Sequence, residues 1–193
     1  MSLETMERTG LMPLVEVVRR ALRETPTWPV LGDSLVAGMR HHLPRVADVL
    51  TPRERQGNPD RAGSVPIWVE PDGSFSVVAF VARPGQGTGI HDHVTWCVLG
   101  VVQGTEDEEL FTLEPGDHAL VRTERRCNRI GDVSAFAPPG DIHRVTNSGL
   151  GPAISLHVYG VDVARLGSSV RRYYDQPVIA GRLTPIVRKG HLS

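Results

Sequence analysis

The chain has 193 residues, which is enough for one domain with a substantial hydrophobic core and too few for two full-sized domains. Lys and Arg number 21 and Asp and Glu number 22, so the formal charge of -1 gives no overall electrostatic case for nucleic acid or an anionic membrane as a partner. These values favour a protein that acts on a small molecule.

Neither a membrane span nor an export signal is expected from the sequence. Apolar runs stay short of the roughly 18 residues that a span needs, and the N-terminus has no basic segment followed by an apolar one. The 2 cysteines, Cys97 and Cys127, are too few for a disulfide scaffold. We therefore expect reduced thiols and a cytoplasmic location.

Helical spacing dominates the first part of the chain. Apolar residues from 11 to 24 recur every three or four positions, which predicts an amphipathic helix that ends before Pro26. Its apolar positions are Leu11, Leu14, Val15, Val18 and Leu22. A second helix is predicted around Asp33 to Met39 and a short third one near Arg45 to Leu50. We expect residues 1–63 to form an N-terminal helical extension that packs outside the rest.

Beyond Pro66 the period changes to two and β-branched residues dominate, as in residues 75–81, 98–102 and 118–121. Turns built from Pro, Gly and Asp separate these segments, which is typical of an all-β sandwich or barrel. We therefore predict one all-β domain over residues 64–193. Within it, residues 165–174 are predicted to be helical, and the tail after Pro177 gives no clear pattern.

Three histidines are the strongest candidates for a metal site. His91 and His93 follow a glycine-rich turn, and alternation along a strand places both on one face. His143 follows a Pro-Gly-Asp turn and completes the set from a second strand. One strand histidine is more often structural than a ligand, but packing hardly explains the joint pattern. Imidazole suits Fe, Zn, Cu or Ni, so ligand type alone does not choose the metal.

Ser155, His157 and Tyr159 alternate along a later strand. Taken alone, they are polar groups on a solvent face. Beside a metal site, the same alternation places them in the cavity that holds the metal. Asp92 points opposite to its neighbours and is interpreted as a residue that supports the site or a turn, and Asp141 as a turn residue.

Two of these segments resemble the cupin motifs. The segment Gly85–Gly104 resembles the first motif, with Cys97 where most cupins have a ligating glutamate. Gly131–Asn147 resembles the second motif, one residue longer than usual after its first glycine. Three histidines without the glutamate, followed by Ser-x-His-x-Tyr at residues 155–159, resemble the cysteine dioxygenase family of thiol dioxygenases, closer to its bacterial cysteine and 3-mercaptopropionate enzymes. The resemblance covers about residues 64 to 160.

The resemblance implies a jelly-roll cupin barrel that binds Fe(II) through His91, His93 and His143. It implies that a small-molecule thiol such as cysteine or 3-mercaptopropionate reacts with O2 to give the sulfinic acid. The family's pattern also implies catalytic roles for Ser155, His157 and Tyr159.

In the family, the tyrosine that matches Tyr159 positions substrate and dioxygen, and the residues that match His157 and Ser155 orient its hydroxyl. Two interpretations of Cys97 stay open. It is either a small buried core residue or, as in animal members of the family, the partner of the tyrosine in a thioether cross-link.

A cation for a substrate carboxylate is expected among the arginines. Mammalian-type members carry an arginine upstream of the first motif, where this chain has Val65. The Val170-Arg171-Arg172 segment looks similar to one in bacterial 3-mercaptopropionate dioxygenases, so Arg172 is the first candidate for substrate binding, and Arg171 or Arg165 follows. The alternative is a solvated basic helix face.

Two other functions stay open: a metal-dependent cupin dioxygenase acting on a carbon substrate, and a non-enzymatic, metal-dependent small-molecule binder. The Ser-His-Tyr alternation favours the thiol dioxygenase, because neither alternative requires it. The physiological thiol and the oligomeric state are left open, and no nucleic acid or membrane partner is expected.

Overall fold

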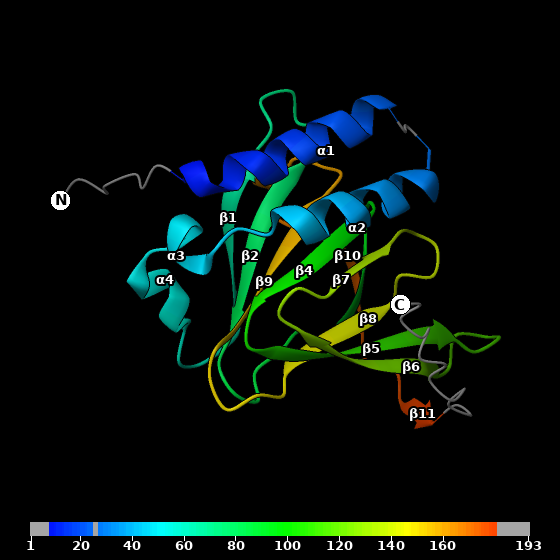
Figure 1. Cartoon of the computed structure of the whole chain (residues 1–193). Helices are drawn as coiled ribbons and strands as arrows, with labels where there is room; N and C mark the ends of the chain where they lie inside the picture. The colour runs from blue at the N-terminus through cyan, green and yellow to red at the C-terminus, as the bar shows by residue number, and fades with distance from the viewer. Residues whose placement is uncertain (1–7, 25–26, 181–193) are drawn as a thin grey trace, which may run out of the picture.

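Two β-sheets face each other, and helices from the first part of the chain cover the outer face of one of them (Figure 1). The computed structural model describes residues 8–24 and 27–180. The sheet beneath the helices has five strands in the order β1-β2-β9-β4-β7. These strands are β1 Gly63–Val69, β2 Ser76–Ala82, β9 Ala153–Tyr159, β4 Cys97–Gln103 and β7 Val133–Phe136.

The opposite sheet has six strands in the order β10-β3-β8-β5-β6-β11. They are β10 Val170–Tyr174, β3 Ile90–His93, β8 His143–Asn147, β5 Thr105–Leu113, β6 Leu120–Arg129 and β11 Val178–Ala180. From β2 to β10 the chain crosses between the sheets at every step except from β5 to β6. This double-sheet winding is a jelly roll, so the expected all-β barrel with helices packed outside is confirmed.

The helices before β1 follow the predicted pattern with one addition. They are the 3-10 turn η1 Thr9–Leu11 and the α-helices α1 Met12–Glu24, α2 Val30–His42, α3 Val46–Val49 and α4 Pro52–Gln56, and a short helix α5 Val163–Leu166 follows β9. The additional helix α4 begins with a capping box, in which the Thr51 hydroxyl accepts a hydrogen bond from the Glu54 backbone and the Glu54 carboxylate accepts one from the Thr51 backbone. Thr-x-x-Glu with a proline after the cap is a helix-start signature that the sequence already contained.

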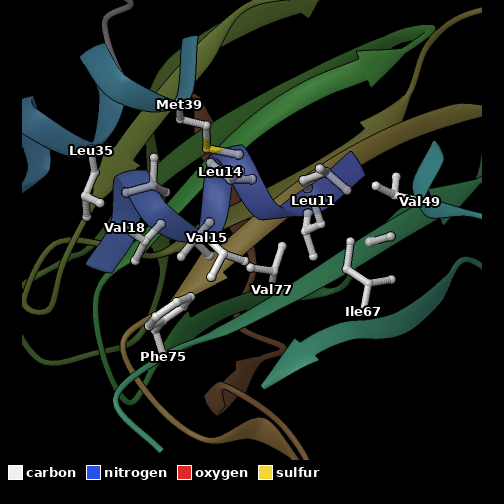
Figure 2. Packing of buried hydrophobic residues seen from close by; sticks show 14 of the residues in the cluster. Leu11, Leu14, Val15, Val18, Leu35, Met39, Val49, Ile67, Phe75 and Val77 are labelled. Carbon is white, nitrogen blue, oxygen red and sulfur yellow. The ribbon is translucent and has the colours of Figure 1, made fainter. Parts of the chain in front are cut away.

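The main hydrophobic core lies between the helices and the five-stranded sheet (Figure 2). Leu14, Val15 and Val18 of α1 are buried there with Val77 of β2. Fully burying a side chain of this size stabilises the fold by roughly 1.5–3 kcal/mol. The outward-facing residues of β9, Ile154, Leu156 and Val158, belong to the same cluster.

Because side chains alternate along a strand, the other face of the five-stranded sheet points into the barrel. Val78, Phe80 and Ala82 of β2 form smaller apolar clusters on that inner side. On β9, the alternation that sends three apolar residues to the helices sends Ser155, His157 and Tyr159 inward. The helix-covered sheet therefore presents a polar row to the barrel interior.

The predicted helix over residues 165–174 is wrong. The helix α5 ends at Gly167, whose φ of 77° is the left-handed conformation that commonly terminates helices. The chain then forms strand β10, which pairs with β3. The tail without a clear pattern contributes β11, which pairs parallel with β6.

No helix in the described part of the chain is both long enough and apolar enough to cross a membrane.

Candidate metal centre

His91, His93 and His143 come together inside the barrel. His91 and His93 lie on the same face of β3, and His143 on β8 pairs with His91 across the ladder. One ring nitrogen from each of the three lies within 4.8 Å of the others. All three side chains are buried, with 5%, 0% and 1% exposure in chain order. The spacing is that of ligands to one small ion.

The protein holds each of these rings through its Nδ1 atom. The Nδ1 of His91 donates to the Gly89 carbonyl at 2.9 Å. The Nδ1 of His93 is 3.2 Å from a carboxylate oxygen of Asp141, and that of His143 is 3.1 Å from one of Glu108. These contacts assign the proton to Nδ1 and leave Nε2 as the free lone pair.

The Nε2 atoms of His93 and His143 are buried and have no hydrogen-bond partner among the described residues. Two orphaned buried nitrogens that converge on one point are what a metal site requires before the ion is added. Burial, followed by the neighbouring His143 and His93, lowers the pKa of His91 to about 3, so its ring is neutral at physiological pH. The residues present therefore fit a divalent metal ion.

Asp141, interpreted from the sequence as a turn residue, also supports the site. It is 1% exposed, and one carboxylate oxygen accepts hydrogen bonds from both the backbone N–H and the ring of His93. Glu108 has the same role for His143 and was not identified from the sequence. Burial acts to raise the pKa of Glu108, but hydrogen bonds from His143 and Asn128 outweigh it and lower that pKa.

Asp92 supports the site from behind, on the face of β3 opposite to the histidines. It is fully buried, accepts a hydrogen bond from the Tyr174 hydroxyl at 2.7 Å, and pairs with Arg171. Burial opposes ionisation of Asp92, but Arg171 and Tyr174 hold its pKa below the ordinary value. These contacts tie β10 to the strand that carries two of the histidines.

The same contacts show where the candidate substrate arginines lie. Arg172 lies with its guanidinium 4.2 Å from the centre of the Tyr174 ring and donates to that hydroxyl. Neither Arg172 nor Arg171 lines the cavity, and Arg165 is exposed on α5. The ladder explains this, since an irregularity between Val170 and Arg172 pairs Arg172 with Asp92 and leaves Tyr173 against His91.

A cavity of about 380 Å³ opens onto the histidines. His91 and His143 form part of its wall, as do the inward residues His157 and Tyr159. Among the described residues, no lysine or arginine lines it. Its remaining polar side chains carry hydroxyl groups and belong to Ser64, Thr88, Ser168, Ser169 and Tyr173.

Ser155, His157 and Tyr159 form one hydrogen-bonded row beside the histidines. The Ser155 hydroxyl is 2.9 Å from Nε2 of His157, and the Tyr159 hydroxyl is 3.1 Å from its Nδ1. Burial lowers the pKa of His157 and raises that of Tyr159, so both are neutral at physiological pH. The Tyr159 ring lies 5.6 Å from that of His93, which brings the row to the candidate metal position.

Cys97 lies directly opposite Tyr159 in the ladder between β4 and β9. Its sulfur is buried and 3.9 Å from Nδ1 of His157. Burial raises the pKa of this thiol well above its ordinary value. The position accommodates both interpretations of Cys97, a packed core residue and a partner for the tyrosine.

Comparison with known proteins gives one family match, and the family is described as cysteine dioxygenase type I. Its model matches residues 64–171, which contain all three histidines and the Ser-His-Tyr row.

Several solved structures are also similar. The TT1209 protein of Thermus thermophilus is 21% identical, with 58% of this chain and 97% of that one covered and a TM-score of 0.42. A conserved protein with a double-stranded beta-helix domain from Klebsiella pneumoniae subsp. pneumoniae is 19% identical over 61% and 82%, with a TM-score of 0.45. A Cupin 2 conserved barrel domain protein from Salinispora arenicola is 21% identical over 61% and 90%, with a TM-score of 0.42.

Replacing His91, His93 or His143 singly by Ala should remove or greatly weaken metal binding, because only two imidazoles remain to hold the ion. Elemental analysis of the purified variants measures this. His118→Ala is the control, since His118 is exposed and outside the site. Stoichiometric metal in all three single variants would contradict the assignment.

Glu108→Gln and Asp141→Asn should each lower metal affinity by about 10- to 100-fold, because they replace the charged acceptors that orient two of the rings with neutral, weaker ones. Competition with a chelator of known affinity measures the change. Glu109→Gln serves as the control, since Glu109 pairs with Arg122 and Arg144 instead. Affinities equal to that of the wild type would show that the carboxylates do not tune the site.

Proposed function

The chain belongs to the cysteine dioxygenase type I family, and from this premise we propose that it is an Fe(II)-dependent dioxygenase that oxidises a small thiol to its sulfinic acid. In the proposed reaction both atoms of O2 are added to the sulfur of RSH, which gives RSO2H. The observation that carries the proposal is the Ser-His-Tyr row beside three converging imidazoles, because a simple metal binder needs no such row.

The three-histidine site and the family together imply a metal cofactor. His91, His93 and His143 would hold it through Nε2. When bound, a ferrous ion supplies the redox chemistry that dioxygen requires and favours the thiolate form of a coordinating sulfur. A reaction of this kind needs a reducing compartment that keeps iron ferrous, in line with the cytoplasmic location expected from the sequence.

The chain's own residues contribute orientation and a hydrogen bond. Tyr159 stays protonated because burial raises its pKa, so its hydroxyl is available as a donor at the cavity wall. His157 fixes the direction of that hydroxyl, and Ser155 fixes the ring of His157. The apolar residues of the wall, such as Phe80 and Val145, keep bulk water from the reacting sulfur.

The size and lining of the cavity support a small substrate such as cysteine, 3-mercaptopropionate or a close analogue. Within the described residues, its polar groups away from the histidines are hydroxyls. We propose that Thr88, Ser169 and Tyr173 provide the hydrogen bonds for the polar end of the substrate. Arg171 would then bind Asp92, and Arg172 would bind Tyr174 of β10, so that neither arginine binds the substrate.

Tyr159→Phe should retain the metal and lower kcat on the best thiol by about tenfold or more, because losing one well-placed hydrogen bond is worth ~1.4 kcal/mol in the transition state. Oxygen consumption and sulfinate formation are followed for cysteine, 3-mercaptopropionate and cysteamine, with metal content measured in parallel. An unchanged rate in the Phe variant would remove Tyr159 from the reaction. Absence of sulfinate from every thiol tested with iron-loaded wild type would reject the proposed function.

The arrangement of Cys97 opposite Tyr159 supports a thioether that forms by oxidation of the pair, with dioxygen taking up two electrons and two protons. The intact mass of the wild type after turnover should then be about 2 Da below the mass expected from the sequence, because two hydrogens are lost. Cys97→Ser should show its expected mass under the same conditions. A wild-type mass equal to the sequence value would leave Cys97 as a packing residue.

A further inference from the structure

Glu106 is a buried carboxyl group that the proposed reaction does not yet use. It lies on β5, is 0% exposed, and neither of its oxygens makes a hydrogen bond of ordinary geometry with a described residue. Leaving a buried polar group without a partner is costly, and a buried charge more so. A carboxyl group kept in this position is therefore a candidate for a functional role.

Strand β5, which carries Glu106, contacts β9 inside the barrel, and the Ser155 hydroxyl of β9 is the neutral polar group that interacts with Glu106. Two neutral residues lie opposite Glu106 in the sheet, Asn128 on β6 and Asn147 on β8. Their amide groups donate elsewhere, to Glu108 and to the backbone carbonyl of residue 82. A side-chain interaction with Ser155 lowers the pKa of Glu106, against the larger effect of burial, which raises it.

The titratable groups near Glu106 are few among the described residues. Glu108 on the same strand raises its pKa further, and His157 of β9 lies beyond Ser155. No arginine or lysine contributes to its pKa. With burial as the largest cause, the pKa of Glu106 is raised to about 7. Glu106 therefore changes its charge within the physiological range.

We propose that Glu106 is the inner end of the Ser155-His157-Tyr159 row and that its protonation sets the direction of every hydrogen bond in that row. Glu106 is thus a positioning residue, since it acts on the reacting atoms through three other groups. The inference rests on the proposed function for its catalytic consequence, but the link between Glu106 and Ser155 is testable without turnover.

The two directions follow from the donors and acceptors of each group. A charged Glu106 only accepts, so Ser155 donates to it, His157 donates from Nε2 to Ser155, and Tyr159 donates to Nδ1 of His157. A protonated Glu106 donates to Ser155, Ser155 donates to Nε2, and Nδ1 donates to the Tyr159 oxygen. Only in this second state is the Tyr159 proton free to point into the cavity, toward Ser169 and a substrate.

The row therefore couples an interior carboxyl group to a hydroxyl at the reaction site. When Glu106 loses its proton, the Tyr159 hydroxyl turns away from the cavity and its donor is lost to the substrate. We expect kcat of the wild type to fall as pH rises through about 7, the pKa of Glu106. Glu106→Gln is neutral at all pH values and still donates through its amide, so this fall should disappear in the variant.

Thermal unfolding tests the buried carboxyl group without turnover. A folded-state pKa raised from 4.5 to about 7 contributes stability that is fully present below 4.5 and is lost as pH rises toward 7. The Tm of wild type should therefore fall relative to the Tm of Glu106→Gln as pH rises over this interval, and the difference between the two Tm values should level off above it. Glu109→Gln, on the same strand, should show no such change relative to wild type above pH 5, because the pKa of Glu109 is lowered. A Tm difference between wild type and Glu106→Gln that is flat from pH 5 to 8 would overturn the proposal.

Steady-state rates then test the coupling. The ratio of wild-type kcat to Glu106→Gln kcat should fall roughly tenfold between pH 6 and pH 8, the titration expected of a single group with a pKa near 7. Ser155→Ala should lose the pH-dependent fall in kcat but keep a pH-dependent Tm, with the transition moved to higher pH, because Glu106 still titrates without the interaction that lowers its pKa and is disconnected from the row. A constant kcat ratio, or a fall that persists in Ser155→Ala, would contradict the coupling. If wild type forms no sulfinate from any thiol, the proposed function fails, whereas the unfolding comparison still decides whether Glu106 titrates near pH 7.

Discussion

The hydrogen bonds that anchor Nδ1 of the three histidines are the constraint on which the site depends. Each ring is held by an acceptor of the barrel, a backbone carbonyl for His91 and the carboxylates of Asp141 and Glu108 for the other two. Because those acceptors fix the tautomer and the ring orientation, each Nε2 remains free for the ion. Two of the acceptors carry negative charge, which would compensate the charge of a divalent cation held by the three rings.

Strand alternation makes such a polar interior compatible with a stable fold. On β9, Leu156 and Val158 face the helices and belong to the main hydrophobic core, while His157 and Tyr159 face the barrel. Because burial of the outer face stabilises the fold, the inner face can carry polar groups that serve the reaction. The N-terminal helices thus support the candidate site without contributing to the cavity wall.

The sequence predicted those parts of the site that follow from a period of two. Alternation alone placed His91 with His93 and aligned the Ser155–Tyr159 row, and motif resemblance identified the family. The glutamates were missed because a run of acidic residues from 106 to 109 is typical of a solvated strand edge, and only the packing of β5 against other strands shows which of them are buried. The direction of Arg172 could not be predicted, because the irregularity in the β3–β10 ladder that decides it has no signature in the sequence.

Transfer of oxygen from dioxygen to sulfur is the central claim, and isotope labelling tests it most directly. The iron-loaded protein is incubated with its best thiol under isotopically labelled dioxygen in ordinary water, and the product is analysed by mass spectrometry, with the reverse labelling as control. The account predicts a sulfinic acid in which both oxygen atoms carry the label from dioxygen. A sulfinic acid with oxygen taken from water, or a disulfide as the sole product, would contradict it.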